Sequence, residues 1–116
     1  VATAADTLEE LGYEVKVPGL VKGKTGVDHQ FTLTCTKGGR VVAMDVVTVE
    51  PDQKVDMNKV LPSFAKFMDV SVTIRLLLVL PGVAQEVREF LKANQVLLVE
   101  GQNLHEVSAG MRQVLK

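Results

Sequence analysis

The sequence has little cysteine, few aromatic residues and no long apolar stretch, and each shortage excludes a class of protein. A single cysteine, Cys35, excludes an intramolecular disulfide framework and a zinc site built from several cysteines. The longest apolar run, residues 76–80, is far shorter than the about 20 residues of a membrane-spanning helix. One Tyr and four Phe are too few to form a stacking platform for single-stranded nucleic acid. We therefore expect a soluble, cytoplasmic protein with no membrane partner.

Neither sign of charge is in excess. Thirteen Lys and Arg residues against fourteen Asp and Glu residues give a formal net charge of -1, so no overall field attracts the chain to nucleic acid. Any binding to DNA must then be local. With 116 residues and 47% hydrophobic content, residues 1–116 are expected to form one domain. Because the first residue is Val rather than Met, a longer polypeptide with flanking domains stays open.

Two strand patterns meet at a pair of glycines. From Val27 the apolar residues recur with a period of two, which places Val27, Phe31, Leu33 and Cys35 on one face. This pattern makes Cys35 a buried, unreactive thiol. The run VVAMDVVTV continues as a second strand, and Gly-Gly favours a tight turn between the two. We predict a β-hairpin centred on residues 38–39.

Helical and strand patterns alternate along the rest of the chain. The glycines of residues 20–26 predict a turn or an irregular crossing, and Pro62 is expected in the first turn of its helix or at a kink. Helices are predicted over 2–11, 57–69, 83–94 and 103–115, and further strands over 13–17, 71–80 and 96–100. The order αβββαβαβα predicts a mixed five-stranded sheet with helices on both faces.

Two acids in the predicted hairpin carry a family resemblance. Asp28 stands in GVDHQF and Asp45 in AMDVV. With the element order, the chain resembles the PD-(D/E)XK nuclease superfamily, which includes type II restriction enzymes, archaeal Holliday junction resolvases and Mrr-like enzymes. The resemblance implies a restriction-endonuclease-like three-layer α/β/α fold, and it implies Asp28 and Asp45 as the catalytic acids that bind Mg²⁺. Glu9 or Glu10 would be the acid of the first helix, unless both simply lie on a solvated helix face.

The chain departs from the family motif at Val47, where the superfamily has a catalytic lysine. Removing one group that stabilises transition-state charge slows a reaction by about 10² to 10³, so we expect impaired hydrolysis. Another lysine could replace it. Lys66, on the predicted helix beside the third strand, is our first choice, ahead of Lys16, Lys24 and Lys54, although a lone helix lysine is usually solvated.

The predicted hairpin register tests whether the two acids share an ion. With a two-residue turn at 38–39, Asp45 lies opposite Thr32 and Asp28 lies opposite Val49. Asp28 is then four residues along the strand from Thr32, which is about 13 Å. One ion cannot bridge that distance. A bulge or a shifted turn would bring the two carboxylates together.

Other polar residues have weaker patterns. His29 points away from Asp28 on the strand and is expected as a hydrogen-bonded, partly buried imidazole. The segment KGKTG lacks the spaced first glycine of a phosphate-binding loop and leads into a strand, so we reject a nucleoside triphosphate site. A local basic rim for phosphate contacts, or a set of solvated loop cations, is formed by Lys16, Lys22, Lys24, Lys37 and Arg40.

Three functions follow from these patterns. The first is a catalytically impaired nuclease-like domain that acts as a binding or regulatory module on DNA or on a protein partner. The second is a Mg²⁺-dependent DNA endonuclease with a displaced lysine, Lys66 or Lys54. The third is a scaffold domain in which the apolar strands at 72–80 and 96–100 leave one sheet edge or a helix face for a second subunit.

Overall fold

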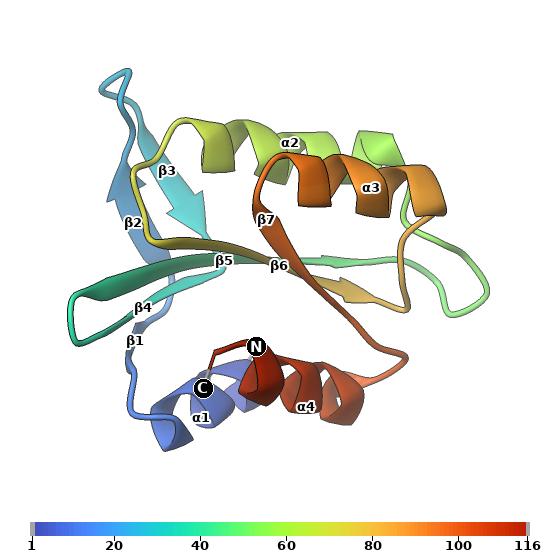
Figure 1. The fold of residues 1–116 in the computed structure, drawn as a ribbon, viewed down its shortest axis with the longest axis horizontal. Helices are drawn as coiled ribbons and strands as arrows, with labels where there is room; N and C mark the ends of the chain where they lie inside the picture. Colours follow the sequence, from blue (N-terminus) through green and yellow to red (C-terminus); the bar gives the residue numbers. More distant parts are fainter. Residues whose placement is uncertain (1, 116) are drawn as a thin grey trace.

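The computed structural model describes residues 2–115, which form three layers, α/β/α, around a mixed five-stranded sheet (Figure 1). The helices are α1 (Ala2–Glu10), α2 (Met57–Met68), α3 (Gln85–Ala93) and α4 (Leu104–Val114). The strands are β1 (Glu14–Lys16), β2 (Gly19–Lys22), β3 (Asp28–Phe31), β4 (Leu33–Lys37), β5 (Arg40–Thr48), β6 (Ile74–Leu80) and β7 (Val96–Glu100). The predicted fold class is confirmed.

The five strands of the sheet are arranged in the order β1-β4-β5-β6-β7. β1, β4 and β5 are antiparallel neighbours, and β5, β6 and β7 run parallel because α2 and α3 cross over between them. β6 is therefore interior, whereas β7 is an edge strand. Of the two strands that we considered for a homodimer, only β7 leaves backbone groups open to another chain. No helix in the described part of the chain has both the length and the apolar composition to span a bilayer.

Alternate residues of each strand enter two separate cores. On one face, Val42 and Met44 of β5 pack with Leu8 of α1 and Met111 of α4. On the other face, Ala43 packs beneath α2 and α3, in a core that holds Val60, Phe67, Val87 and Leu91. Asp45 has the parity of Ala43. The sequence alternation of β5 thus points Asp45 toward α2.

The hairpin turn has the predicted register. Lys37 pairs with Arg40, and both Gly38 and Gly39 have positive φ, at 55° and 83°. A two-residue turn with positive φ at both positions matches the twist of paired strands, and glycine adopts it without a Cβ penalty. The residues of β4 and β5 therefore pair in the register that a two-residue turn at 38–39 requires.

The predicted continuous strand from Val27 to Cys35 is wrong, because the chain bends at Thr32. β3 before the bend pairs with β2 in a separate two-stranded sheet, and β4 after it joins the main sheet. Phe31 therefore enters the core under α2, whereas Leu33 and Cys35 enter the core under α1. Val27 is exposed. Residues 20–26, expected as irregular, hold most of β2 and the turn into β3.

One of our two expectations placed Pro62 in the first turn of its helix, and this expectation is wrong. Helix α2 begins after Asp56, whose side chain accepts a hydrogen bond from the Lys59 amide, and Pro62 is the sixth residue. The N-terminal cap fixes the start of the helix. From there, Val60, Ser63 and Phe67 face the sheet.

Candidate functional site

Asp45 is a buried carboxylate at the centre of the sheet. It lies on β5 with 5% of its surface exposed, on the face covered by α2. A buried carboxylate is costly unless donors surround it. The groups that contact Asp45 therefore decide what chemistry this position supports.

Three donors from two segments contact the two oxygens of Asp45. Oδ1 accepts a hydrogen bond from the Thr32 amide at 2.9 Å, at the bend between β3 and β4. Oδ2 accepts one from Ser63 Oγ at 2.7 Å and forms an ion pair with Lys66 Nζ at 2.7 Å. Ser63 and Lys66 lie three residues apart on α2, so both reach one face. Neither Thr32 nor Ser63 was predicted as a site residue. Ser63 could have been predicted from its three-residue spacing from Lys66, which places both side chains on one face of the helix.

Lys66 lies where a displaced lysine was expected. Its ammonium group contacts Asp45, donates to the Gln30 carbonyl at 2.7 Å and lies 4.8 Å from the centre of the Phe31 ring. Only 27% of the side chain is exposed. It is thus not the solvated helix lysine of our alternative, and it ties α2 to β3 and β5 at once.

The structure does not bring Asp28 to this site. Asp28 begins β3, pairs with Lys22 across the small hairpin and is exposed, whereas Asp45 belongs to the main sheet. Four residues of extended chain separate Asp28 from Thr32, about 13 Å. Neither the bulge nor the shifted turn that would join the carboxylates is present. Asp28 and Asp45 thus lie on different sheets, an arrangement that does not support a shared metal ion, and their joint role as metal ligands stays a prediction.

The two candidate helix acids lie on the other side of the sheet. Glu9 and Glu10 are exposed on α1, which packs with α4 on the face opposite Asp45. Glu10 pairs with Arg112 of α4 at 2.6 Å. Neither acid reaches Asp45 through the sheet, and the solvated-face alternative describes both.

The residues at Asp45 do not fit a Mg²⁺ site. Mg²⁺ takes six oxygen ligands and is usually held by one or two carboxylates with water. Here the single carboxylate already accepts from an amide, a hydroxyl and an ammonium group. Across residues 2–115, no group of three His, Cys, Asp or Glu side chains is placed to hold a metal. The Lys66 ammonium group already lies 2.7 Å from Asp45 Oδ2.

A shallow cavity of about 330 Å³ opens beside this network. Its lining includes Asp45 and Lys66 of the network and Pro18 and Gln30 at the small hairpin. The cavity thus connects the buried ion pair with the exposed face of the β2–β3 hairpin.

The five predicted phosphate contacts divide into two groups. Lys37 donates to the Leu11 carbonyl at 2.6 Å, where it caps the end of α1, and Arg40 donates to Tyr13 Oη at 3.0 Å. Both have structural partners. Lys16, Lys22 and Lys24 are exposed on β1, β2 and the turn that follows β2. Among residues 2–115, the side chains of these three lysines have no ion pair or hydrogen bond, so they are the cations of the predicted rim that are open to a ligand.

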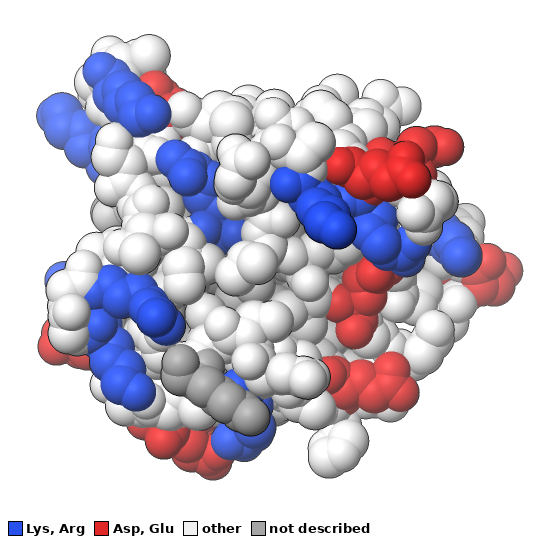
Figure 2. All heavy atoms as spheres, in the orientation of Figure 1, with Lys and Arg blue, Asp and Glu red and all other residues white. Residues whose placement is uncertain are grey.

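Charge is unevenly divided along the chain. Residues 14–40 hold five Lys and Arg and two acids, a net +3, whereas the remaining eight Lys and Arg and twelve acids give -4. Figure 2 shows Lys and Arg over the hairpin and over the β4–β5 turn, at the left of the view, whereas at the right Lys and Arg lie among acids. The end of the protein that carries the hairpin is therefore positive despite the net charge of -1.

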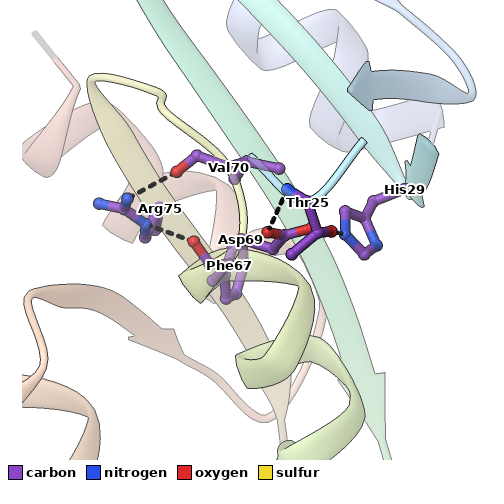
Figure 3. A network of polar contacts seen from close by, with 6 residues as sticks. All are labelled: Thr25, His29, Phe67, Asp69, Val70 and Arg75. Atoms are coloured by element: carbon purple, nitrogen blue, oxygen red, sulfur yellow. Dashed lines mark hydrogen bonds and ion pairs between the residues drawn. The ribbon is translucent and has the colours of Figure 1, made fainter. Parts of the chain in front are cut away.

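A second polar network joins the hairpin to the end of α2 (Figure 3). Asp69 Oδ2 accepts hydrogen bonds from His29 Nε2 at 2.6 Å and from Thr25 Oγ1 at 2.7 Å, and Oδ1 accepts one from the Thr25 amide at 3.1 Å. The hydrogen bond from His29, followed by that from Thr25, lowers the pKa of Asp69. We call these three side chains the clasp. The predicted hydrogen-bonded, partly buried state of His29 is confirmed, but its partner was not predicted.

Two further features fix the position of the clasp: hydrogen bonds from Arg75 and the close approach of Gly23. Arg75 of β6 donates to the Phe67 and Val70 carbonyls at 2.7 Å each, which fixes the end of α2 that carries Asp69. A Cβ atom on Gly23 would lie 2.0 Å from Asp69 Oδ2, so the close approach of the turn requires glycine there. Cys35 is buried, as predicted, and burial raises the pKa of its thiol to about 12.

Comparison with known proteins yields a structural likeness alone. No protein-family model matches this sequence, and no curated protein matches it either. The crystal structure of AF1548, a protein of unknown function, is similar to this chain with a TM-score of 0.74 and 18% sequence identity. The likeness is one of fold. It covers 97% of this chain and 65% of the AF1548 chain, so this chain spans about two thirds of the length of that protein.

Proposed function

We propose that this chain is a DNA-binding domain of the restriction-endonuclease-like type that contacts phosphates without cleaving them. The observation that carries the proposal is the exposure of Lys16, Lys22 and Lys24 on and beside the small hairpin, within residues 14–40 that carry a net +3. Lysines that neutralise phosphates supply most of non-specific DNA affinity. The superfamily resemblance supports the same class of partner.

The arrangement at Asp45 supports binding without hydrolysis. Hydrolysis by a site of this class requires a metal-bound water and a cation that stabilises the developing charge. Asp45 instead bonds Thr32, Ser63 and Lys66, and Asp28 points to solvent on another sheet. The Asp45 network then serves to hold α2, β3 and β5 in a fixed arrangement.

The test is a binding and cleavage assay on the same protein. With phosphate contacts from Lys16 and Lys24, affinity for duplex DNA should fall about 12-fold between 50 and 200 mM salt. Replacing Lys16, Lys22 and Lys24 by Ala should remove most of the binding, whereas Lys92→Ala, on α3 beside the far edge of the sheet, should not. No detectable binding at low salt would contradict the proposal and favour a protein partner.

A second candidate, the Mg²⁺-dependent endonuclease, is favoured by one observation. Lys66 Nζ lies 2.7 Å from Asp45, where a displaced catalytic lysine would be needed. Plasmid, branched and single-stranded DNA incubated with Mg²⁺ or Mn²⁺ separate the candidates. We expect no cleavage. Cutting that Asp45→Asn and Lys66→Met each abolish, in variants that remain folded, would establish the enzyme instead.

A further inference from the structure

The small hairpin presents a distinct set of side chains to solvent. Along β2 and β3, one face packs on the protein through Gly19, Val21, His29 and Phe31. The other face carries two cross-strand pairs, Leu20 with Gln30 and Lys22 with Asp28. All four of these residues are exposed.

The hairpin also carries the most exposed apolar side chains in the described part of the protein. Leu20 is 68% exposed, and Val17 and Val27, which flank the hairpin at its base and its tip, are each 55% exposed. Other large apolar side chains between residues 4 and 115 are less exposed. The concentration of such side chains on one small ribbon distinguishes it from the rest of the surface.

The exposed face has the chemistry of base recognition. In the major groove, Gln pairs with adenine, Lys with guanine O6 and N7, an acid accepts from cytosine N4, and an apolar side chain contacts the thymine methyl group. Gln30, Lys22, Asp28 and Leu20 supply one of each. Asp28 would weaken a surface that bound phosphates alone, but it is useful on a surface that reads bases.

The dimensions agree with a groove. Two paired strands of four residues form a ribbon about 13 Å long, which covers about four base pairs. The major groove of B-form DNA is about 12 Å wide and admits a two-stranded ribbon. Lys16 lies near the base of the ribbon and Lys24 in its turn, so the two lysines bracket the ribbon where phosphates would border a groove.

We propose that the β2–β3 hairpin enters the major groove of duplex DNA and reads bases through Leu20, Lys22, Asp28 and Gln30. This inference rests on the proposed function and adds sequence preference to it. The ribbon is held in place, because Phe31 stacks on Phe67 at 5.4 Å and the clasp joins its turn to α2 (Figure 3). A ribbon that is ordered before binding loses less conformational entropy on binding.

An anionic membrane surface is the other partner that lysines with exposed apolar side chains could fit. The positions of the side chains favour DNA. Val17 and Val27 lie at opposite ends of the ribbon, and Asp28 and Gln30 interrupt the apolar surface between them. A ribbon that inserted into lipid would bury a carboxylate and an amide without partners.

The experiment selects bound duplexes from a random-sequence duplex library and then measures the affinity for the selected and a scrambled duplex by fluorescence anisotropy. Gln30→Ala and Asp28→Ala should each reduce the preference for the selected duplex by roughly 10- to 100-fold. Gln113→Ala, an exposed glutamine on α4, is the matched control and should change nothing. Lys24→Ala should reduce the affinity for both duplexes by the same factor. Urea unfolding of each variant verifies that it folds.

Each outcome decides between the two proposals. Duplex binding with no selected sequence, or with a preference that the hairpin variants retain, overturns the hairpin reading and leaves DNA binding intact. Absence of any duplex binding overturns both. Binding to phosphatidylglycerol vesicles, which compete with duplex DNA for wild type but not for Leu20→Ala, would identify the ribbon as a membrane contact and also overturn the reading.

Discussion

At the residue scale, Asp45 shows how one carboxylate changes role when its neighbours change. The lone pairs that would bind a metal accept instead from Thr32, Ser63 and Lys66. A satisfied buried network of this kind rigidifies its surroundings. Hydrolysis needs some of those lone pairs to be free for an ion. The ion pair therefore favours a structural role over a catalytic one.

Lys66→Met should destabilise the fold by about 1 to 3 kcal/mol, because the buried Asp45 then keeps only neutral donors. Methionine preserves much of the apolar stem beside Phe31, so lost packing contributes little. Urea unfolding measures the change. Lys59→Met, on the exposed side of the same helix, should stay within about 0.5 kcal/mol. In the double variant with Asp45→Asn, the loss should be smaller than the sum of the two; strict additivity would refute the coupling.

The clasp predicts a specific acid sensitivity. The pKa of Asp69 is lowered from its ordinary 3.8 by the hydrogen bonds from His29 and Thr25. Its stabilisation is therefore complete above about pH 4 and is lost as the pH falls through the lowered pKa of the folded state. Between pH 5 and pH 3, the urea concentration at the midpoint of unfolding should fall further for wild type than for Asp69→Asn. Asp52→Asn, in an exposed loop, should follow wild type; equal acid profiles for all three proteins would exclude the clasp as a source.

At the element scale, the hairpin marks where sequence patterns predict the fold and where they stop. The Gly38-Gly39 turn was predictable because its backbone conformation is a property of those two residues. The bend at Thr32 was not, because the Thr32 amide leaves the strand ladder to bond Asp45, a contact thirteen residues away in sequence. The period-two pattern of apolar residues continues past Thr32, so periodicity alone predicted one unbroken strand. The same error placed Asp28 on the main sheet, whereas its expected role as a metal ligand came from the family resemblance.

Resemblance and spacing together located Lys66, since the expected helix does pack beside the strand that carries Asp45. Asp69 was missed for a different reason. It caps the end of α2, where a polar residue is unremarkable, and only tertiary packing brings His29 and Thr25 to it. Contacts between residues 40 to 44 positions apart have no local signal.

Gly23→Ala should open the clasp, because the new methyl group would overlap the Asp69 carboxylate at 2.0 Å. We expect a lower urea midpoint and faster hydrogen exchange at the Gly23 and Gly26 amides, which close the hairpin turn. Asp69→Ala removes the overlapping atoms. The double variant Gly23→Ala with Asp69→Ala should then have nearly the same free energy of unfolding as Asp69→Ala alone. If Gly23→Ala lowered the free energy of unfolding as much in that background as in wild type, the glycine would be required for another reason.

At the scale of the whole molecule, the separation of charge matters more than the total. Residues 14–40 carry +3 in a protein of net charge -1, and the rest of the chain carries -4. Net charge sets the weak long-range field, whereas phosphate contacts depend on the few cations that touch the DNA backbone. A variant series can separate these two contributions because the chain offers exposed lysines at both ends.

Two double variants make this comparison at equal net charge. Lys16→Ala with Lys24→Ala, and Lys59→Ala with Lys92→Ala, each change the formal charge from -1 to -3. Only the first pair lies at the positive end. The slope of log affinity for duplex DNA against log salt should become shallower by about 1.8 for the first pair, at about 0.9 per lost phosphate contact, and stay at the wild-type value for the second. Fluorescence anisotropy across a salt series measures both slopes. If the two variants changed alike, overall charge and not the hairpin side would govern binding, and the DNA-facing surface would have to be sought elsewhere.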